Sequence, residues 1–126
     1  DRFKAINDTH GHPGGDHVLH TLVPLLQGRV RASELLARYG GEEFTVILPE
    51  TPLTGAIQVA ERIRDRIRLI EFPGVGHVTA SIGVSSYPVN ALGKEDLIRV
   101  ADQALYIAKN NGRDRVAYFN YQLITR

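Results

Sequence analysis

The chain has 126 residues, 43% of them hydrophobic and 23% charged, and these proportions predict one globular domain with its own core. The formal net charge is only +1, which argues against a large non-specific nucleic-acid-binding surface, since such a surface needs a clustered basic excess. There is no cysteine, so disulfides and thiolate metal sites are excluded, and no apolar run approaches the ~18 residues of a membrane span. Without a recognisable signal peptide, we expect a soluble, intracellular domain.

The first half of the chain predicts a helix followed by a hairpin. A turn-rich segment, residues 7–16, precedes a run of apolar residues at helical spacing. Two short apolar segments, at residues 35–39 and 44–48, are typical of strands. Gly40 and Gly41 lie between them, where a tight hairpin turn requires positive φ angles.

The second half predicts two long helices and two strands. Apolar residues recur at steps of three and four over residues 56–70 and again over 97–108, as on amphipathic helices. Residues 78–85 alternate as a strand does, and Gly83 is expected to mark a bulge. Residues 116–119 are expected to form a last strand.

The expected order is therefore helix, strand, strand, helix, strand, helix, strand, with one more strand just before residue 1. This order predicts an α+β fold with a ferredoxin-like βαββαβ core and an additional helix and strands. Because such a fold carries many unrelated functions, the chemistry has to be inferred from particular side chains.

Two adjacent carboxylates in the segment "RYGGEEF" are the first candidates for chemistry. Neighbours on a strand point to opposite faces, so Glu42 and Glu43 do not belong to one solvated face. Gly40 and Gly41 let a ligand approach the backbone closely, and carboxylate oxygens suit hard cations beside phosphates. Without these two considerations, an ordinary hairpin with solvated glutamates would explain the segment equally well; the considerations favour a binding role.

Two further polar clusters admit either a structural or a binding role. In the glycine-rich loop "NDTHGHPGGD", which also carries His12, Asn7 and Asp16 match the edge of guanine, although an Asx turn and a helix N-cap are the structural alternatives. Lys109 and Arg113 are spaced to compensate the dipole at a helix end or to grip a polyphosphate.

Taken together, four segments resemble the GGDEF family of diguanylate cyclases: "FKAINDTHGHPGGD", "RYGGEEF", "ASIGVSSYP" and "ADQALYIAKNNGRDRV". The resemblance runs from residue 1 to about residue 119, with Glu in place of the Asp in the family name. It implies a nucleotide-cyclase fold similar to a polymerase palm, and it makes residues 1–126 one GGDEF domain, the C-terminal part of a larger signalling protein. Two such domains, each holding one GTP, would form cyclic di-GMP and release two pyrophosphates.

The resemblance also implies roles for individual residues. Asn7 and Asp16 would recognise guanine, with His12 near the nucleotide, while Gly40 and Gly41 let the substrate lie against the hairpin. The remaining implied residues are the metal-binding, catalytic carboxylates and the cations that contact phosphate: Glu42, Glu43, Lys4, Lys109 and Arg113. Glu42 would also assist deprotonation of the attacking 3′-hydroxyl. Two Mg²⁺ or Mn²⁺ ions per active site would activate this nucleophile and neutralise the phosphoryl charge.

The partners implied by the resemblance are GTP, cyclic di-GMP, a second copy of the domain, and an upstream sensor or receiver domain. No nucleic-acid polymer and no membrane contact are expected for the domain itself. It would work in the cytoplasm, alone or as the cytoplasmic part of a membrane-anchored or multidomain protein.

The sequence departs from the family pattern at its beginning. The first family motif reads Asp-x-Asp-x-Phe-Lys, and alignment on Phe3 and Lys4 makes Asp1 its second acid. The first acid, a metal ligand in the family, then falls two residues before this chain, together with the first strand. We therefore expect a truncated domain that is weakly active or inactive and that folds with strand exchange or another segment in the gap.

A second departure concerns product inhibition. Many family members carry Arg-x-x-Asp before the hairpin, where the product binds, and this chain has Arg31 and Glu34 instead. Glutamate is one methylene longer than aspartate, so we expect this site to be absent or weakened. Arg62 matches a secondary product-contacting arginine, with a solvated helix face as the alternative.

Three other functions fit the sequence less well than cyclase activity. A degenerate member that binds GTP or cyclic di-GMP without turnover is disfavoured by the intact hairpin acids. An RNA-binding module requires stacked aromatics and a basic surface, whereas the aromatic residues here are expected mainly in the core. A purely structural dimerisation domain leaves the clustered polar residues unexplained.

Overall fold

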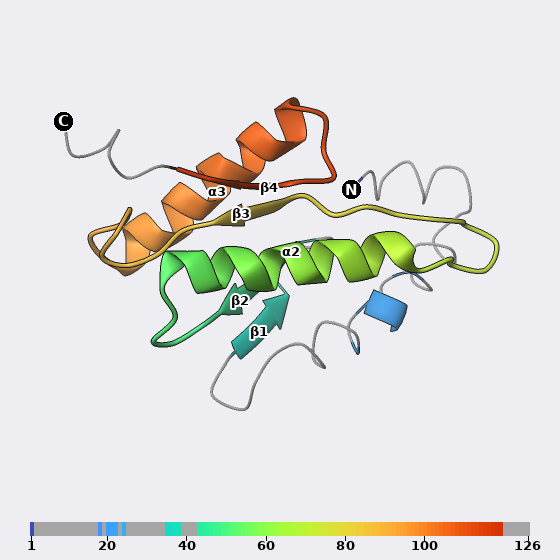
Figure 1. Cartoon of the computed structure of the whole chain (residues 1–126), viewed down its shortest axis with the longest axis horizontal. Helices are drawn as coiled ribbons and strands as arrows, with labels where there is room; N and C mark the ends of the chain where they lie inside the picture. Colours follow the sequence, from blue (N-terminus) through green and yellow to red (C-terminus); the bar gives the residue numbers. More distant parts are fainter. Residues whose placement is uncertain (2–17, 19, 23, 25–34, 39–42, 120–126) are drawn as a thin grey trace. The chain divides into compact units, whose positions relative to one another are not determined.

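Figure 1 shows the protein as a computed structural model. The structure describes residues 1, 18, 20–22, 24, 35–38 and 43–119. Residues 18, 20–22 and 24 are helical, as expected for the first helix. The further elements are, in chain order, β1 (Leu35–Arg38), β2 (Phe44–Ile47), α2 (Leu53–Leu69), β3 (Ile82–Val84), α3 (Lys94–Asn110) and β4 (Val116–Tyr118).

The chain divides into two compact units. One unit consists of Asp1, Thr51–Arg68 and Thr79–Arg126, and therefore holds α2, β3, α3 and β4. The other consists of Arg2–Glu50 and Leu69–Val78 and holds the β1–β2 pair. The presence of both helices and strands confirms the predicted α+β class.

β1 and β2 form the antiparallel hairpin that the sequence predicts, with Leu35 opposite Ile47 and Arg38 opposite Phe44. Residues 39–42, which connect the two strands and include the predicted Gly40-Gly41 turn, lie outside the described residues.

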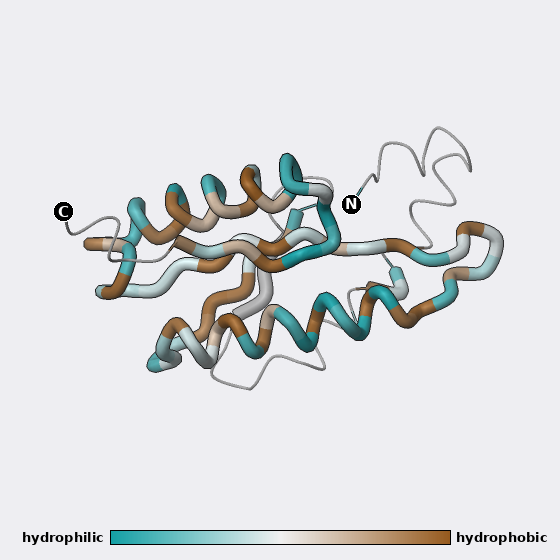
Figure 2. Tube along the Cα trace, turned by 45° about the horizontal axis from the view of Figure 1, so that its top comes forward, coloured by the Kyte–Doolittle hydropathy of each residue, from teal (hydrophilic) through white to brown (hydrophobic). Residues whose placement is uncertain are grey.

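Both long helices follow the predicted periodicity, and Figure 2 shows hydrophobic and hydrophilic residues alternating along them. The buried side chains of α2 and α3 recur at helical spacing: Ala60, Ile63, Ile67, Val100, Ala104 and Ala108. The charges complement the helix dipole, with Asp96 in the first turn of α3 and Lys109 in its last turn. Asp96 accepts from Arg99 Nη2 at 2.9 Å and from the backbone N–H of Leu92, and these bonds lower the pKa of its carboxyl.

None of the described helices has the length and apolarity needed to span a bilayer.

β3 and β4 are parallel neighbours joined through α3, which packs against both strands (Figure 1). A parallel pair needs such a crossover, and a helix is its usual form. Gly83 pairs with Ala117 in an uninterrupted register, so the predicted bulge is wrong. Gly83 instead makes room for α3, because a Cβ there would collide with the carbonyl oxygen of Ala101 and lie 2.5 Å from the backbone nitrogen of Leu105.

The loop between β3 and α3 is fixed by polar groups. Asn90 is 2% exposed, and its amide accepts from the backbone N–H of Ser86 at 2.7 Å and donates to the carbonyl of Phe119 at 3.2 Å. The hydroxyl of Ser85 donates to the carbonyl of Leu97 at 2.6 Å. The segment "ASIGVSSYP" thus serves packing and loop structure in this unit.

The aromatic residues do not gather in the core as expected. Tyr87, Tyr106 and Tyr118 are 62%, 67% and 49% exposed, whereas Phe72 is 1% exposed. Tyr106 lies between Ala104 and Ala108 along α3, two positions from either, and so falls on the opposite face from the buried stripe. A buried tyrosine hydroxyl needs a hydrogen-bond partner, whereas an exposed one can bond water, and this difference favours exposed positions.

Candidate functional site

Most of the predicted site lies outside the residues that the structure describes. This applies to Lys4, Asn7, His12, Asp16, Arg31, Glu34, Gly40, Gly41 and Glu42, whose roles stay predictions. The described candidates are Glu43 in one unit and Arg62, Lys109 and Arg113 in the other.

Glu43 directly precedes β2, and its side chain is partly exposed. Its carboxylate is the kind of oxygen donor that Mg²⁺ prefers. Among the described residues there is no group of three or more His, Asp or Glu side chains that could hold a metal ion. Arg62 is exposed on α2. This position agrees both with a product-contacting arginine and with a solvated helix face.

The two predicted phosphate-binding cations lie at the end of α3. Lys109 belongs to the last turn of the helix, and Arg113 to the loop that follows. The helix ends at Asn110, and the N–H of Arg113 donates back to the carbonyl of Ala108 at 3.0 Å. Within the described part of the chain, the guanidinium of Arg113 makes no hydrogen bond or ion pair.

The backbone of this loop is unusual. Gly112, Arg113 and Asp114 have φ angles of 114°, 61° and 47°, three successive residues in the left-handed region. This conformation suits glycine but costs about 1–2 kcal/mol for each other residue. Aspartate tolerates it better than arginine does. Contacts from elsewhere in the unit must therefore offset the cost.

Those contacts come from two distant segments. Arg64 Nη1 on α2 donates to Asp114 Oδ1 at 3.0 Å and to the carbonyl of Asp114 at 3.3 Å. The N–H of Asp114 donates to Asp1 Oδ2 at 3.1 Å. Asp1 is in turn bound to the segment before β3, because Thr79 Oγ1 donates to its Oδ2 at 2.8 Å and Ser81 Oγ to its Oδ1 at 2.6 Å.

Arg64 is itself held in place on α2. Its Nε donates to Glu61 Oε1 at 2.9 Å and its Nη2 to Asp65 Oδ1 at 3.2 Å, and its side chain is 17% exposed. The hydrogen bond to Glu61 and the bonds to Asp114 raise the pKa of Arg64, so the guanidinium stays protonated. Sequence reasoning missed this network, because Arg64 and Asp114 are 50 positions apart and resemble ordinary surface charges.

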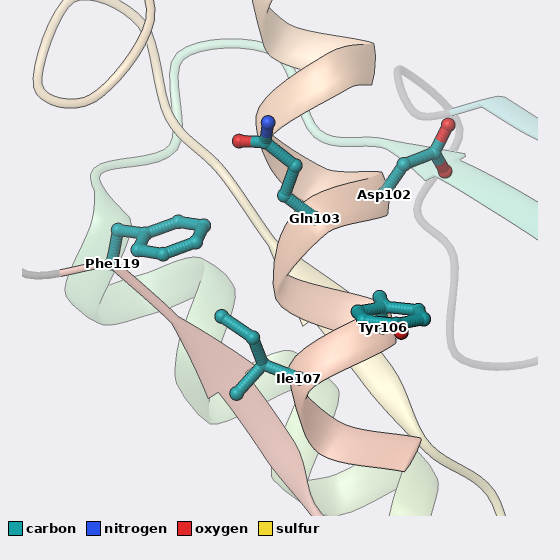
Figure 3. Close-up of a pocket in the computed structure, with 5 residues that line it drawn as sticks. All are labelled: Asp102, Gln103, Tyr106, Ile107 and Phe119. Carbon is teal, nitrogen blue, oxygen red and sulfur yellow. The ribbon is translucent and has the colours of Figure 1, made fainter. Parts of the chain in front are cut away.

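A shallow hollow of about 530 Å³ lies beside α3, and it is lined by Asp102, Gln103, Tyr106, Ile107 and Phe119. Figure 3 shows Gln103 and Ile107 projecting from α3 on the side of Phe119. None of the predicted site residues lines this hollow. We therefore do not assign it to the substrate.

The fold and the cationic loop after α3 define a mixed α+β domain with a candidate anion-binding end. The chain matches the family model "Diguanylate cyclase, GGDEF domain" over residues 1–115. It belongs to this family, as the sequence motifs predict.

Two curated relatives illustrate the similarity. The chain is 45% identical over 116 residues to diguanylate cyclase DgcM of Escherichia coli strain K12, covering 92% of this chain and 28% of that protein. It is 46% identical over 122 residues to response regulator PleD of Caulobacter vibrioides strain NA1000, covering 92% of this chain and 27% of that protein. The chain thus spans little more than a quarter of the length of these relatives.

Solved structures of other proteins share the fold of this chain. The active GGEEF domain of a diguanylate cyclase from Vibrio cholerae superimposes with a TM-score of 0.87 at 40% identity, over 94% of this chain and 77% of that one. The GGDEF domain of DgcB from Caulobacter crescentus, solved in complex with c-di-GMP, gives a TM-score of 0.83 at 31% identity, over 94% of this chain and 70% of that one. These similarities confirm the predicted fold.

Proposed function

We propose that this domain is the catalytic domain of a diguanylate cyclase, which condenses two GTP molecules into cyclic di-GMP and releases two pyrophosphates. One observation carries the proposal: a match to the GGDEF family over residues 1–115 coincides with an intact "GGEEF" segment. Relatives named diguanylate cyclases support it at about 45% identity.

In this proposal the base and the phosphates are bound by different segments. Asn7 and Asp16 pair with the guanine edge, beside His12. Gly40 and Gly41 leave the hairpin backbone bare, so that the nucleotide lies directly against it. The cations that bind the phosphates are Lys4, Lys109 and Arg113, of which Arg113 offers a planar fork of donors.

The carboxylates Glu42 and Glu43 would hold two Mg²⁺ or Mn²⁺ ions, since hard cations take oxygen ligands. Bound there, the ions would supply charge neutralisation for the phosphoryl group and the leaving pyrophosphate. Glu42 would accept the proton of the 3′-hydroxyl of one GTP. That oxygen then bonds to the α-phosphorus of the second GTP while the bond to the β-phosphate breaks, and pyrophosphate leaves with the electron pair.

Each ring closure needs two nucleotides facing each other, so we propose a homodimer in which each copy holds one GTP. The domain would act in the cytoplasm, under the control of a sensor or receiver domain upstream. The relative DgcB, crystallised with c-di-GMP, supports binding of the product by a domain of this fold.

The experiment that tests the proposal is incubation of the longer protein that we propose carries this domain with α-labelled GTP and Mg²⁺ or Mn²⁺, followed by identification of the labelled product. We expect cyclic di-GMP, with one molecule formed and two pyrophosphates released for every two GTP consumed. Labelled ATP is the control and should give no cyclic product, because Asn7 and Asp16 are matched to guanine. Tight GTP binding without any turnover would contradict the proposal and favour a regulatory nucleotide-binding module.

A separate prediction concerns feedback by the product. Because Glu34 replaces the shorter Asp of the inhibitory Arg-x-x-Asp motif, we expect cyclic di-GMP to bind more weakly than submicromolar. Replacement of Arg31 by alanine should then change the affinity little. Isothermal titration calorimetry measures both, with the exposed Arg62→Ala variant as a comparison. Submicromolar binding that is lost in Arg31→Ala would show a working inhibitory site.

A further inference from the structure

The network of Asp1, Arg64 and Asp114 has no role in the function proposed so far, and it holds the loop that carries Arg113. We propose that Arg64 and Asp114 are positioning residues, which fix this loop so that the guanidinium of Arg113 meets the phosphates of GTP. The inference rests on the proposed function, because it deepens the role assigned to Arg113.

Within the loop, the backbone of Arg113 and its guanidinium differ in how they are held. The backbone of Arg113 and Asp114 is in the left-handed region at both residues and does not adopt this conformation without support. The guanidinium of Arg113, by contrast, has no partner among the described residues. A backbone held firmly beneath a free cationic side chain is the arrangement that pre-orients a group for a ligand.

Hydrogen bonds to two distant segments converge on Asp114. Its carboxylate and its carbonyl both accept from Nη1 of Arg64, and its N–H donates to Asp1, which is 113 positions away in the sequence. Asp1 in turn accepts from Thr79 and Ser81 in the segment before β3. One residue of the loop is therefore tied to α2 and, through Asp1, to the segment that leads into β3.

The ion pair of Arg64 with Asp114 is partly buried. The side chains of Arg64 and Asp114 are 17% and 30% exposed, whereas those of the ion-paired Arg99 and Asp96 on α3 are 58% and 34% exposed. Solvent and salt screen a partly buried pair less than an exposed one. The side chain of Arg64 is also held by Glu61 and Asp65. Arg64 therefore loses little further conformational freedom when it binds Asp114.

The test compares GTP with guanosine, which shares the base and sugar but has no phosphates. In Asp114→Asn, which keeps a residue that tolerates the left-handed region, we expect GTP affinity to fall about tenfold and guanosine affinity to stay unchanged. Arg64→Gln should do the same. The double variant should lose no more than either single one, because both weaken the same charge-assisted contact. In turnover, KM for GTP should rise more than kcat falls.

Two controls accompany these variants. Arg99→Gln removes an arginine whose ion pair with Asp96 has the same 2.9 Å length as that of Arg64 with Glu61, and it should change neither affinity. Arg113→Ala should weaken GTP at least as much as Asp114→Asn does. Thermal unfolding confirms that each variant is folded.

The outcomes separate this inference from the proposed function. A protein that binds GTP, but in which Asp114→Asn and Arg64→Gln leave the GTP-to-guanosine ratio unchanged, overturns the positioning role and leaves the proposed function intact. Equal losses for GTP and guanosine also overturn it, because they indicate a purely structural role. A wild-type protein that does not bind GTP overturns both.

Discussion

Replacing Gly83 by alanine is expected to destabilise the domain by about 3 kcal/mol, the upper part of the range for overpacked sites. The added Cβ would collide with the carbonyl oxygen of Ala101 and approach the backbone nitrogen of Leu105 to 2.5 Å. Both are backbone atoms of α3, which cannot rotate away as a side chain can. The helix would have to move off β3, and urea unfolding followed by circular dichroism would measure the loss.

The matched control is the same substitution at Gly93, which precedes α3. A Cβ there meets nothing within 4 Å, and its φ of −176° is extended backbone that any residue adopts. Alanine caps a helix less well than glycine, so we expect a cost of at most about 1 kcal/mol. Equal stability of Gly83→Ala and Gly93→Ala would show that α3 does not pack as closely on β3 as the structure places it.

Replacing Glu42 by alanine is expected to reduce cyclic di-GMP formation by about 10³-fold or more. The proposed metal ligand contributes several kcal/mol of charge stabilisation to the transition state, and each 1.36 kcal/mol corresponds to a factor of ten in rate. GTP binding should partly survive, because guanine and the phosphates are assigned to other residues. Turnover of labelled GTP and equilibrium binding, measured on the same protein, separate the two effects.

Glu71 offers a control for this variant, because it is an exposed glutamate outside the four family motifs. Its replacement by alanine removes one negative charge, as the Glu42 change does, and should leave turnover unaltered. If Glu42→Ala kept wild-type turnover, the hairpin would not be the metal-binding element, and the mechanism proposed for this domain would be wrong.

The helices were the most predictable part of the fold, because their periodicity reflects burial along one face. The predicted segments 56–70 and 97–108 correspond to α2 at Leu53–Leu69 and α3 at Lys94–Asn110. The strand predicted at residues 78–85 is shorter, at Ile82–Val84. Thr79 and Ser81 use their polar groups on Asp1 rather than on a described sheet partner, and alternation alone does not distinguish these two uses.

Only those parts of the candidate site that lie in short sequence motifs could be predicted. The motif order identified the family, and the cationic pair at the end of α3 follows from its sequence. The contact of Arg64 with Asp114 could not be predicted, because the two residues are 50 positions apart. An arginine on a helix and an aspartate in a loop are both common, so neither residue type indicates the contact. Gly83 was assigned a bulge, because a glycine in a strand indicates either a bulge or a close approach, and sequence alone does not decide between them.

The exposed tyrosines have a practical consequence for spectroscopy. The chain contains no tryptophan and five tyrosines, so its near-ultraviolet emission comes from tyrosine alone. Tyr87, Tyr106 and Tyr118 already face water in the folded domain, and their surroundings change little when the chain unfolds. Intrinsic fluorescence of these three is therefore a poor monitor of unfolding, and a tryptophan introduced at Phe72, which is buried, would give a usable signal.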